Sequence, residues 1–244
     1  MPSWRGVNFL GNRAKEWRMP EPPPIGRVVL WLAVLFALIH GCMALYEQTV
    51  QYFALSDGVG FLPLKKKVIH LPHWKSAFYV HVFTSIFALF AAFTQFVPIK
   101  NRWLAKVHRW AGRIYVFNIL LLCAPSGLLL ACYAEGGIVG RLGFATLACL
   151  WFATTALGLR AILKRKVSRH QEWMIRSYAL TFSAVTLREW QYWFAVLLPP
   201  TYNTFPLVAW LGWLLNLMLA EIWIRWKRRS LLALELLPKT VRDH

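Results

Sequence analysis

The sequence predicts an all-α protein, a polytopic membrane bundle of about six transmembrane helices with both termini in the cytoplasm. Composition indicates this class, because 58% of the 244 residues are hydrophobic and 14 are Trp. Six apolar runs are each about long enough to cross a hydrocarbon core of about 30 Å. These runs are 27–47, 75–98, 108–132, 142–162, 174–198 and 205–226. We therefore expect a cytoplasmic Pro-rich basic arm over 1–26, a transmembrane domain over 27–227 and a cytoplasmic tail over 228–244.

The distribution of basic residues gives the orientation. If the six runs alternate in direction, the two tails and the second and fourth connections share one side and carry 21 Lys and Arg residues, against five on the other side. Such a bias predicts that the basic side is cytoplasmic. The net charge of +18 is thereby explained by topology, with membrane lipids as partners and no nucleic acid.

Before the second run, the candidates for chemistry are histidines. His40 lies in the first run and either bonds a neighbouring carbonyl or serves as a ligand. His70 and His73 are three residues apart, but no third ligand stands at a zinc spacing, so we expect them to be solvated. The chain has four cysteines and no CxxC or CxxCH motif, which argues against disulfides, zinc ribbons and covalently attached haem.

The second run places a polar stripe on one helical face. The residues of this stripe are separated by four, three, four and three positions along the sequence; they are His81, Ser85, Ala88, Ala92 and Gln95. Small residues on such a face are typical of close helix packing in membranes. They are equally typical of a groove, which a histidine would open near the outer surface and a glutamine would close near the inner one.

The third run begins with the segment HRWAGRIYV, residues 108–116. His108 lies at the inner edge of the membrane, and Gly112, one turn later, leaves space beside its imidazole. Arg109 and Arg113 lie four residues apart at the headgroup level, where they hold lipid, phosphate or carboxylate. Farther along, the segment CAPSG at 123–127 predicts a bend whose freed carbonyl is bonded by a neighbouring residue.

The segment 168–188, which leads into the fifth run, carries polar side chains on one helical face. The residues on one narrow arc of this face are His170, Ser177, Thr181, Ala184 and Arg188. Arg188 requires a partner because an unpaired arginine in hydrocarbon costs several kcal/mol, and Glu189 is expected to neutralise part of its charge. Glu172 and Arg176 have the spacing of an intrahelical ion pair.

Two segments carry a resemblance to a known family. The segments 108–116 (HRWAGRIYV) and 169–188 (RHQEWMIRSYALTFSAVTLR), with the His81 helix that ends in QFVP, resemble an uncharacterised, domain-of-unknown-function family of predicted bacterial inner-membrane proteins. The resemblance covers roughly residues 75–195. More distantly, the chain is similar to the transmembrane di-haem cytochromes b. These resemblances imply a multi-pass protein of the bacterial inner membrane that holds haem b between histidines of neighbouring helices.

The histidines suit this expectation as two pairs. On the inner side, His108 and His170 would hold one haem, with Gly112 beside them and Arg109 or Arg113 on the propionates. On the outer side, His81 and His40 lie at similar depths, with Arg188 as partner of a propionate or a quinone. We therefore predict a b-type haem electron-transfer protein, with quinone as a further candidate ligand and membrane oxidoreductase activity left open.

Other functions remain open from the sequence. A non-redox transporter or lipid- or quinone-binding protein would use a groove lined by Ser85, Gln95, Ser177, Thr181 and Arg188. An accessory subunit of a larger membrane complex, or a homo-oligomer, would use the many outward aromatic residues. Because His170 and Arg188 are about 27 Å apart along an ideal helix, the polar face predicts either two stacked sites or one long cleft.

Overall fold

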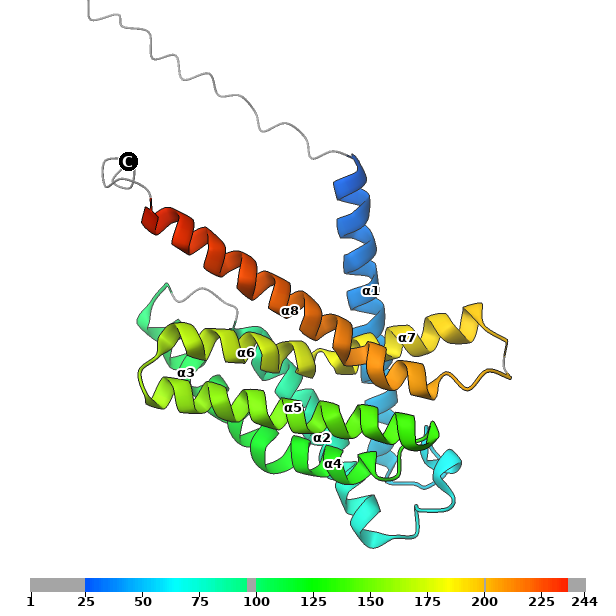
Figure 1. Cartoon of the computed structure of the whole chain (residues 1–244). Coiled ribbons are helices and arrows are strands. Elements are labelled where there is room, and N and C mark those ends of the chain that lie inside the picture. Colours follow the sequence, from blue (N-terminus) through cyan, green and yellow to red (C-terminus); the bar gives the residue numbers. More distant parts are fainter. Residues whose placement is uncertain (1–24, 96–99, 200, 237–244) are drawn as a thin grey trace, which may run out of the picture. The chain divides into compact units, whose positions relative to one another are not determined.

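The computed structural model describes residues 25–95, 100–199 and 201–236, and these residues form helices without any strand (Figure 1). The predicted all-α class is therefore confirmed over this part of the chain. The helices are α1 (Ile25–Val50), α2 (Pro72–Gln95), α3 (Arg102–Asn118), α4 (Ala124–Ala131), α5 (Gly137–Leu163), α6 (Val167–Thr181), α7 (Ser183–Leu197) and α8 (Phe205–Leu236). Two 3-10 turns, η1 (Gln51–Ala54) and η2 (Leu62–Lys65), lie between α1 and α2, and a π-helical turn, η3 (Ile119–Cys123), joins α3 to α4.

The chain divides into two compact units, Met1–Phe36 and Ala37–His244. The described part of the first unit is Ile25–Phe36, the N-terminal portion of α1. The second unit contains the rest of α1 and all the other helices. Residues 1–24 of the predicted basic arm and residues 237–244 of the predicted C-terminal tail lie outside the described residues.

Four helices among the described residues are long and apolar enough to cross a membrane: Pro72–Ala91, Arg102–Ala131, Gly137–Leu163 and Phe205–Arg229. They coincide with four of the six predicted runs. The run 27–47 falls on α1, and the run 174–198 falls on α6 and α7, which meet at Phe182. The protein therefore has several apolar helices, as a membrane protein requires, whereas six spans and cytoplasmic termini stay predictions.

The core of the second unit lies where α2, α3, η3, α5, α6 and α8 meet. Its largest buried members include Tyr115, Trp151, Leu180 and Trp213. A second buried cluster joins the connection between α1 and α2 to the start of α2 and contains Tyr52, Leu62, Trp74 and Phe78. Aromatic and aliphatic side chains also cover outward helix faces, which suits contact with lipid.

Two ion pairs join α6 to α8. Arg176 donates from Nε to Glu221 Oε1 at 2.5 Å and from Nη2 to Glu221 Oε2 at 3.0 Å, and Arg228 donates from Nε to Glu172 Oε1 at 2.6 Å. Glu172 and Arg176 therefore do not form the expected hydrogen-bonded pair within one helix. Each binds a residue of α8 instead, because α8 packs against the face that both side chains share. Helix α8 also contacts α5 and α7, and Figure 1 shows it lying at an angle to α6.

Candidate functional site

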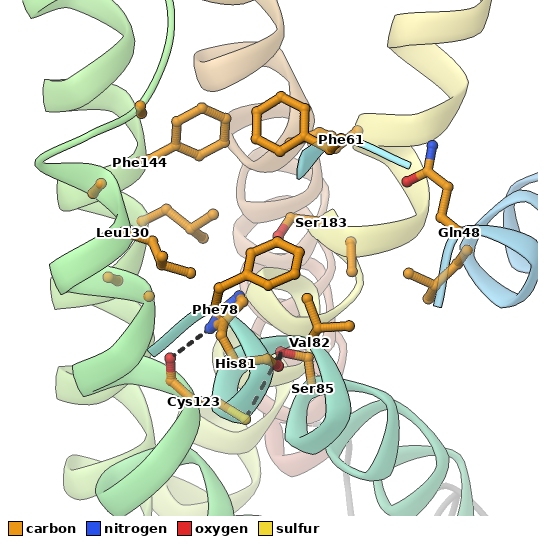
Figure 2. Close-up of a pocket in the computed structure, with 18 of the residues that line it drawn as sticks. Gln48, Phe61, Phe78, His81, Val82, Ser85, Cys123, Leu130, Phe144 and Ser183 are labelled. Carbon is orange, nitrogen blue, oxygen red and sulfur yellow. Dashed lines mark hydrogen bonds between the residues drawn. The ribbon is translucent and has the colours of Figure 1, made fainter. Parts of the chain in front are cut away.

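A cavity of about 520 Å³ lies within the second unit. This volume is within the usual range of small-molecule sites. Its walls come from the end of α1, the connection between α1 and α2, and helices α2, η3, α4, α5, α6, α7 and the start of α8. Most of the surface is apolar, and the rings of Phe61, Phe78 and Phe144 lie around it (Figure 2). The polar or ionisable side chains that line it include Gln48, Lys65, His81, Ser85, Cys123, Glu135, Thr181, Ser183, Arg188 and Gln191.

His81 lines this cavity, and its hydrogen bond defines which tautomer the neutral imidazole adopts. Its Nδ1 lies 2.9 Å from the carbonyl oxygen of Cys123, as Figure 2 shows. A carbonyl oxygen only accepts hydrogen bonds, so Nδ1 carries a proton, and neutral His81 keeps its lone pair on Nε2. No hydrogen bond joins this Nε2 to any described residue of the chain. His81 therefore offers the cavity an unpaired acceptor.

The π-helical turn supplies the acceptor that fixes His81. Within η3, the Ala124 N–H bonds to the Ile119 carbonyl, five residues back, and the helix ladder is widened before Cys123. Gly127 provides the space for the imidazole, because a Cβ atom there would lie 2.9 Å from His81 Cε1. The sequence predicted a bend over 123–127, and the π-helical turn ends at the first residue of this segment, where His81 of α2 bonds the Cys123 carbonyl. The bend itself stays a prediction.

Arg188 is the cationic group of the cavity. Its side chain is half-buried and lines the cavity. Nε donates to Gln48 Oε1 at 3.2 Å, and Nη1 donates to the Ala184 carbonyl at 3.0 Å. No carboxylate among the described residues forms an ion pair with it. Arg188 therefore has neutral partners only.

His40 and Glu189 form a separate pair. His40 Nδ1 lies 2.7 Å from Glu189 Oε1, and the imidazole packs edge-on against Tyr192 with ring centroids 4.7 Å apart. Glu189 therefore binds His40 and not its neighbour Arg188, contrary to expectation. His40 does not line the cavity, so the structure does not place it opposite His81 as a second ligand.

The connection between α1 and α2 covers the cavity. Lys65 is 5% exposed, and its Nζ donates to the Tyr133 carbonyl at 2.6 Å and to Glu135 Oε1 at 2.7 Å. Within the connection, the Phe61 N–H donates to the Tyr52 hydroxyl at 3.1 Å. No local pattern indicates this role for Lys65, because it stands in a run of three lysines that is typical of a solvated connection.

The other predicted histidine pair lies at the end of the bundle where α3 and α6 begin. The charge of His170 acts on His108. His170 Nδ1 lies 2.9 Å from the Gly158 carbonyl, so Nε2 keeps the lone pair of the neutral ring. His108 Nδ1 is buried and has no hydrogen-bond partner among the described residues. The structure therefore places both residues at the same end of the bundle.

The other residues predicted beside this pair have mixed positions. The charge of Arg109 acts on His108, whereas Arg113 stacks over the Trp110 ring, 5.2 Å from its centroid. Gly112 does not open free space, because a Cβ atom there would lie 3.0 Å from Gln95 Oε1. Gln95 therefore packs against this end of the bundle and does not line the cavity.

A buried hydroxyl network lies between the two ends of α6. The Tyr115 hydroxyl bonds to Ser177 Oγ at 2.8 Å and to Thr181 Oγ1 at 2.7 Å. Trp151 Nε1 donates to Thr181 Oγ1 at 2.9 Å, and Thr155 Oγ1 lies 2.7 Å from Ser177 Oγ. Ser177 is fully buried, so it lines no groove. The expectation of one long cleft is therefore wrong, and the cavity and the histidine pair are two separate places.

His70 and His73, in the connection between α1 and α2, were expected to be solvated. His73 Nε2 lies 3.0 Å from the Tyr133 hydroxyl and is exposed, as is His70. Over the described ranges, no cluster of three or more His, Cys, Asp or Glu side chains suits a metal ion.

Residues 78–224 match the family described as "Predicted membrane protein (DUF2306)", and this stretch is more than half of the chain. The chain belongs to this family. No curated protein and no solved structure matches it. The matched stretch contains His81, His108, His170 and Arg188, whereas Lys65 and the rest of the covering connection precede it. Membership in an uncharacterised family of predicted membrane proteins, expected from the sequence, is thereby confirmed.

Proposed function

We propose that the protein binds a quinone or quinol in the cavity beside His81. The observation that carries this proposal is the placement of an unpaired imidazole acceptor and a guanidinium donor on one aromatic-walled cavity. A quinol has a flat apolar ring with an oxygen on each side. One hydroxyl would donate to His81 Nε2, and the other oxygen would accept from Arg188. The rings of Phe61, Phe78 and Phe144 would contact the quinone ring.

The same groups suit proton transfer. When Nε2 of His81 takes the proton of a bound quinol, the imidazolium keeps its hydrogen bond to the Cys123 carbonyl. Arg188 stabilises the negative charge that remains on the ring oxygen. Removal of two electrons from the quinol then requires an acceptor.

A b-type haem is the second candidate, and the pair His108 and His170 favours it. Bis-histidine ligation requires two neutral imidazoles on neighbouring helices, and the hydrogen bond to Gly158 leaves the His170 Nε2 lone pair available. Arg109 would neutralise a propionate. We propose a single haem at this pair, because His40 is engaged by Glu189. The haem would supply one-electron transfer, in a protein of the bacterial inner membrane.

Quinone binding is tested on the purified full chain in detergent with a short-chain benzoquinone. Binding is followed by quenching of tryptophan fluorescence, since Trp74 and Trp151 line the cavity. His81→Gln is expected to weaken binding at least about tenfold, since a hydrogen bond in an apolar site is lost. The matched control is His70→Gln, an exposed histidine outside the cavity, which is expected to bind normally. Unchanged binding in His81→Gln would contradict the proposal.

The haem is tested by the reduced-minus-oxidised visible spectrum of protein expressed with ample haem. We expect a b-type α band that His108→Ala and His170→Ala abolish and His81→Ala retains. Protein without Soret and α bands would rule the haem out and leave quinone binding without an internal electron acceptor. If the protein is instead an accessory subunit, quinone binding and the haem spectrum would appear only in the presence of its partner complex.

A further inference from the structure

We infer that the ligand of the cavity is an acidic amphiphile with one negative charge, of the class of ionised hydroxyquinones, whose anionic oxygen binds Arg188. This inference rests on the proposed function, because it concerns which members of the quinone class the cavity accepts. It is carried by the charges of the cavity wall and by the hydrogen-bonding capacity that the wall leaves unused.

The charges that line the cavity do not cancel. At neutral pH the lining side chains with a formal charge are Lys65, Glu135 and Arg188. Lys65 and Glu135 form an ion pair at 2.7 Å and neutralise each other. Arg188 bonds to the Gln48 amide and the Ala184 carbonyl, both of which are neutral. One positive charge therefore remains on the cavity wall.

The chain does not offer Arg188 a carboxylate within the described residues. Glu189 is its neighbour in sequence, but its carboxylate bonds to His40 at 2.7 Å. The Tyr52 phenol also lines the cavity, but it is neutral at neutral pH and supplies no counter-charge. A guanidinium surrounded by protein and lipid is strongly disfavoured unless it is paired, so a counter-charge from a ligand stabilises this arrangement.

Arg188 also keeps hydrogen-bond donors for such a ligand. A guanidinium has five N–H groups, and the two bonds to Gln48 and Ala184 use one N–H on Nε and one on Nη1. Nη2 donates to no described residue. Three N–H groups therefore stay available, two on Nη2 and one on Nη1. They can donate to an anionic oxygen or to a pair of adjacent oxygens, which are the groups that a guanidinium binds with good geometry.

His81 sets the opposite requirement. Its Nε2 is an acceptor, so the ligand must present a hydroxyl or N–H group there. The complementary ligand has a donor at one position, an anionic oxygen at another and an apolar ring between them. A hydroxyquinone meets these conditions in its two redox forms. Its oxidised form loses the proton of the ring hydroxyl and presents the anionic oxygen to Arg188, and its reduced form presents hydroxyl groups that donate to His81 Nε2.

The test uses two probes with the same ring and alkyl chain, which differ in the charge and the methyl group at one oxygen. They are a 3-alkyl-2-hydroxy-1,4-naphthoquinone, which is an anion at neutral pH, and its 2-methoxy ether, which is neutral. Binding of each to the full chain is measured by tryptophan quenching. We expect the anion to bind at least about tenfold more tightly than the ether, as the loss of a charge-assisted hydrogen bond predicts.

Variants connect that preference to the guanidinium. Arg188→Gln is expected to abolish the preference for the anion, and Arg188→Lys, which keeps the charge, to retain part of it. The matched control is Arg141→Gln, an exposed arginine of α5 outside the cavity, which should keep the full preference. Equal binding of anion and ether to the wild type would overturn this inference while quinone binding stands. A preference that persists in Arg188→Gln would also overturn it, because the charge would then act elsewhere. Failure of both probes to bind would overturn quinone binding as well.

Discussion

Replacement of Tyr115 by Phe tests the hydroxyl network that separates the cavity from the histidine pair. The change removes two hydrogen bonds, to Ser177 at 2.8 Å and to Thr181 at 2.7 Å, and keeps the ring. Hydrogen bonds between membrane helices contribute about 0.6–1.7 kcal/mol each, so the free energy of unfolding should fall by about 1–3 kcal/mol. The lower part of this range is expected, because Ser177 keeps Thr155 and Thr181 keeps Trp151 as partners.

A second tyrosine provides the matched control. The Tyr79 hydroxyl is buried and has no hydrogen-bond partner in the part of the chain that the structure describes, so Tyr79→Phe removes a desolvated polar group and should leave stability unchanged or slightly raised. Both variants are measured by unfolding in mixed detergent micelles and by Tm, where each kcal/mol corresponds to about 2–4 °C for a chain of this size. The reasoning fails if Tyr115→Phe is neutral, or if Tyr79→Phe destabilises the protein as much.

The covering connection and the α6–α8 contact give two further predictions. In protein whose other cysteines are serine, Lys65→Met should raise the rate at which a small thiol reagent labels Cys123 by roughly tenfold, because loss of a buried charged hydrogen bond favours local opening. Lys66→Met changes an exposed neighbour and should leave the labelling rate unchanged. Equal labelling rates in both variants would show that Lys65 does not hold the connection closed. The Arg228 guanidinium holds the pKa of Glu172 below its ordinary value of 4.5, so this pair stabilises the fold above pH 4.5, and its contribution is lost as the pH falls through the lowered pKa. Between pH 7 and pH 3 the free energy of unfolding should therefore fall less in Glu172→Gln than in the wild type. Identical pH profiles of the two proteins would contradict this.

Parts of the site followed from local sequence. His81 and Ser85 were placed on one face by helical spacing alone, and both line the cavity. The segment CAPSG predicted a bend because proline lacks an N–H, and the π-helical turn at Cys123 is found there. The proximity of His108 and His170 was expected because both lie near the starts of helices that begin at the same end of an alternating bundle.

Other parts required contacts between distant segments. Spacing allowed His40 to be paired with His81, but Glu189 of α7 binds it, across 149 residues of sequence. Spacing also paired Glu172 with Arg176 within one helix, whereas α8 supplies a partner for each. Helical spacing states which side chains share a face, and it does not state which neighbouring helix covers that face.

The sequence by itself determined the helical class, the family and some of the groups at the site, such as His81, Ser85 and Arg188, because apolar run length and helical periodicity are local properties of the chain. The tertiary structure decided where the polar face of α6 and α7 is open and where it is closed. Tyr115 and Trp151 bind the hydroxyls of Ser177 and Thr181 and close the middle of that face, and Arg188 remains on an open cavity. The physical reason is that a buried polar group must find a partner, and the helix that supplies it can lie anywhere in the chain.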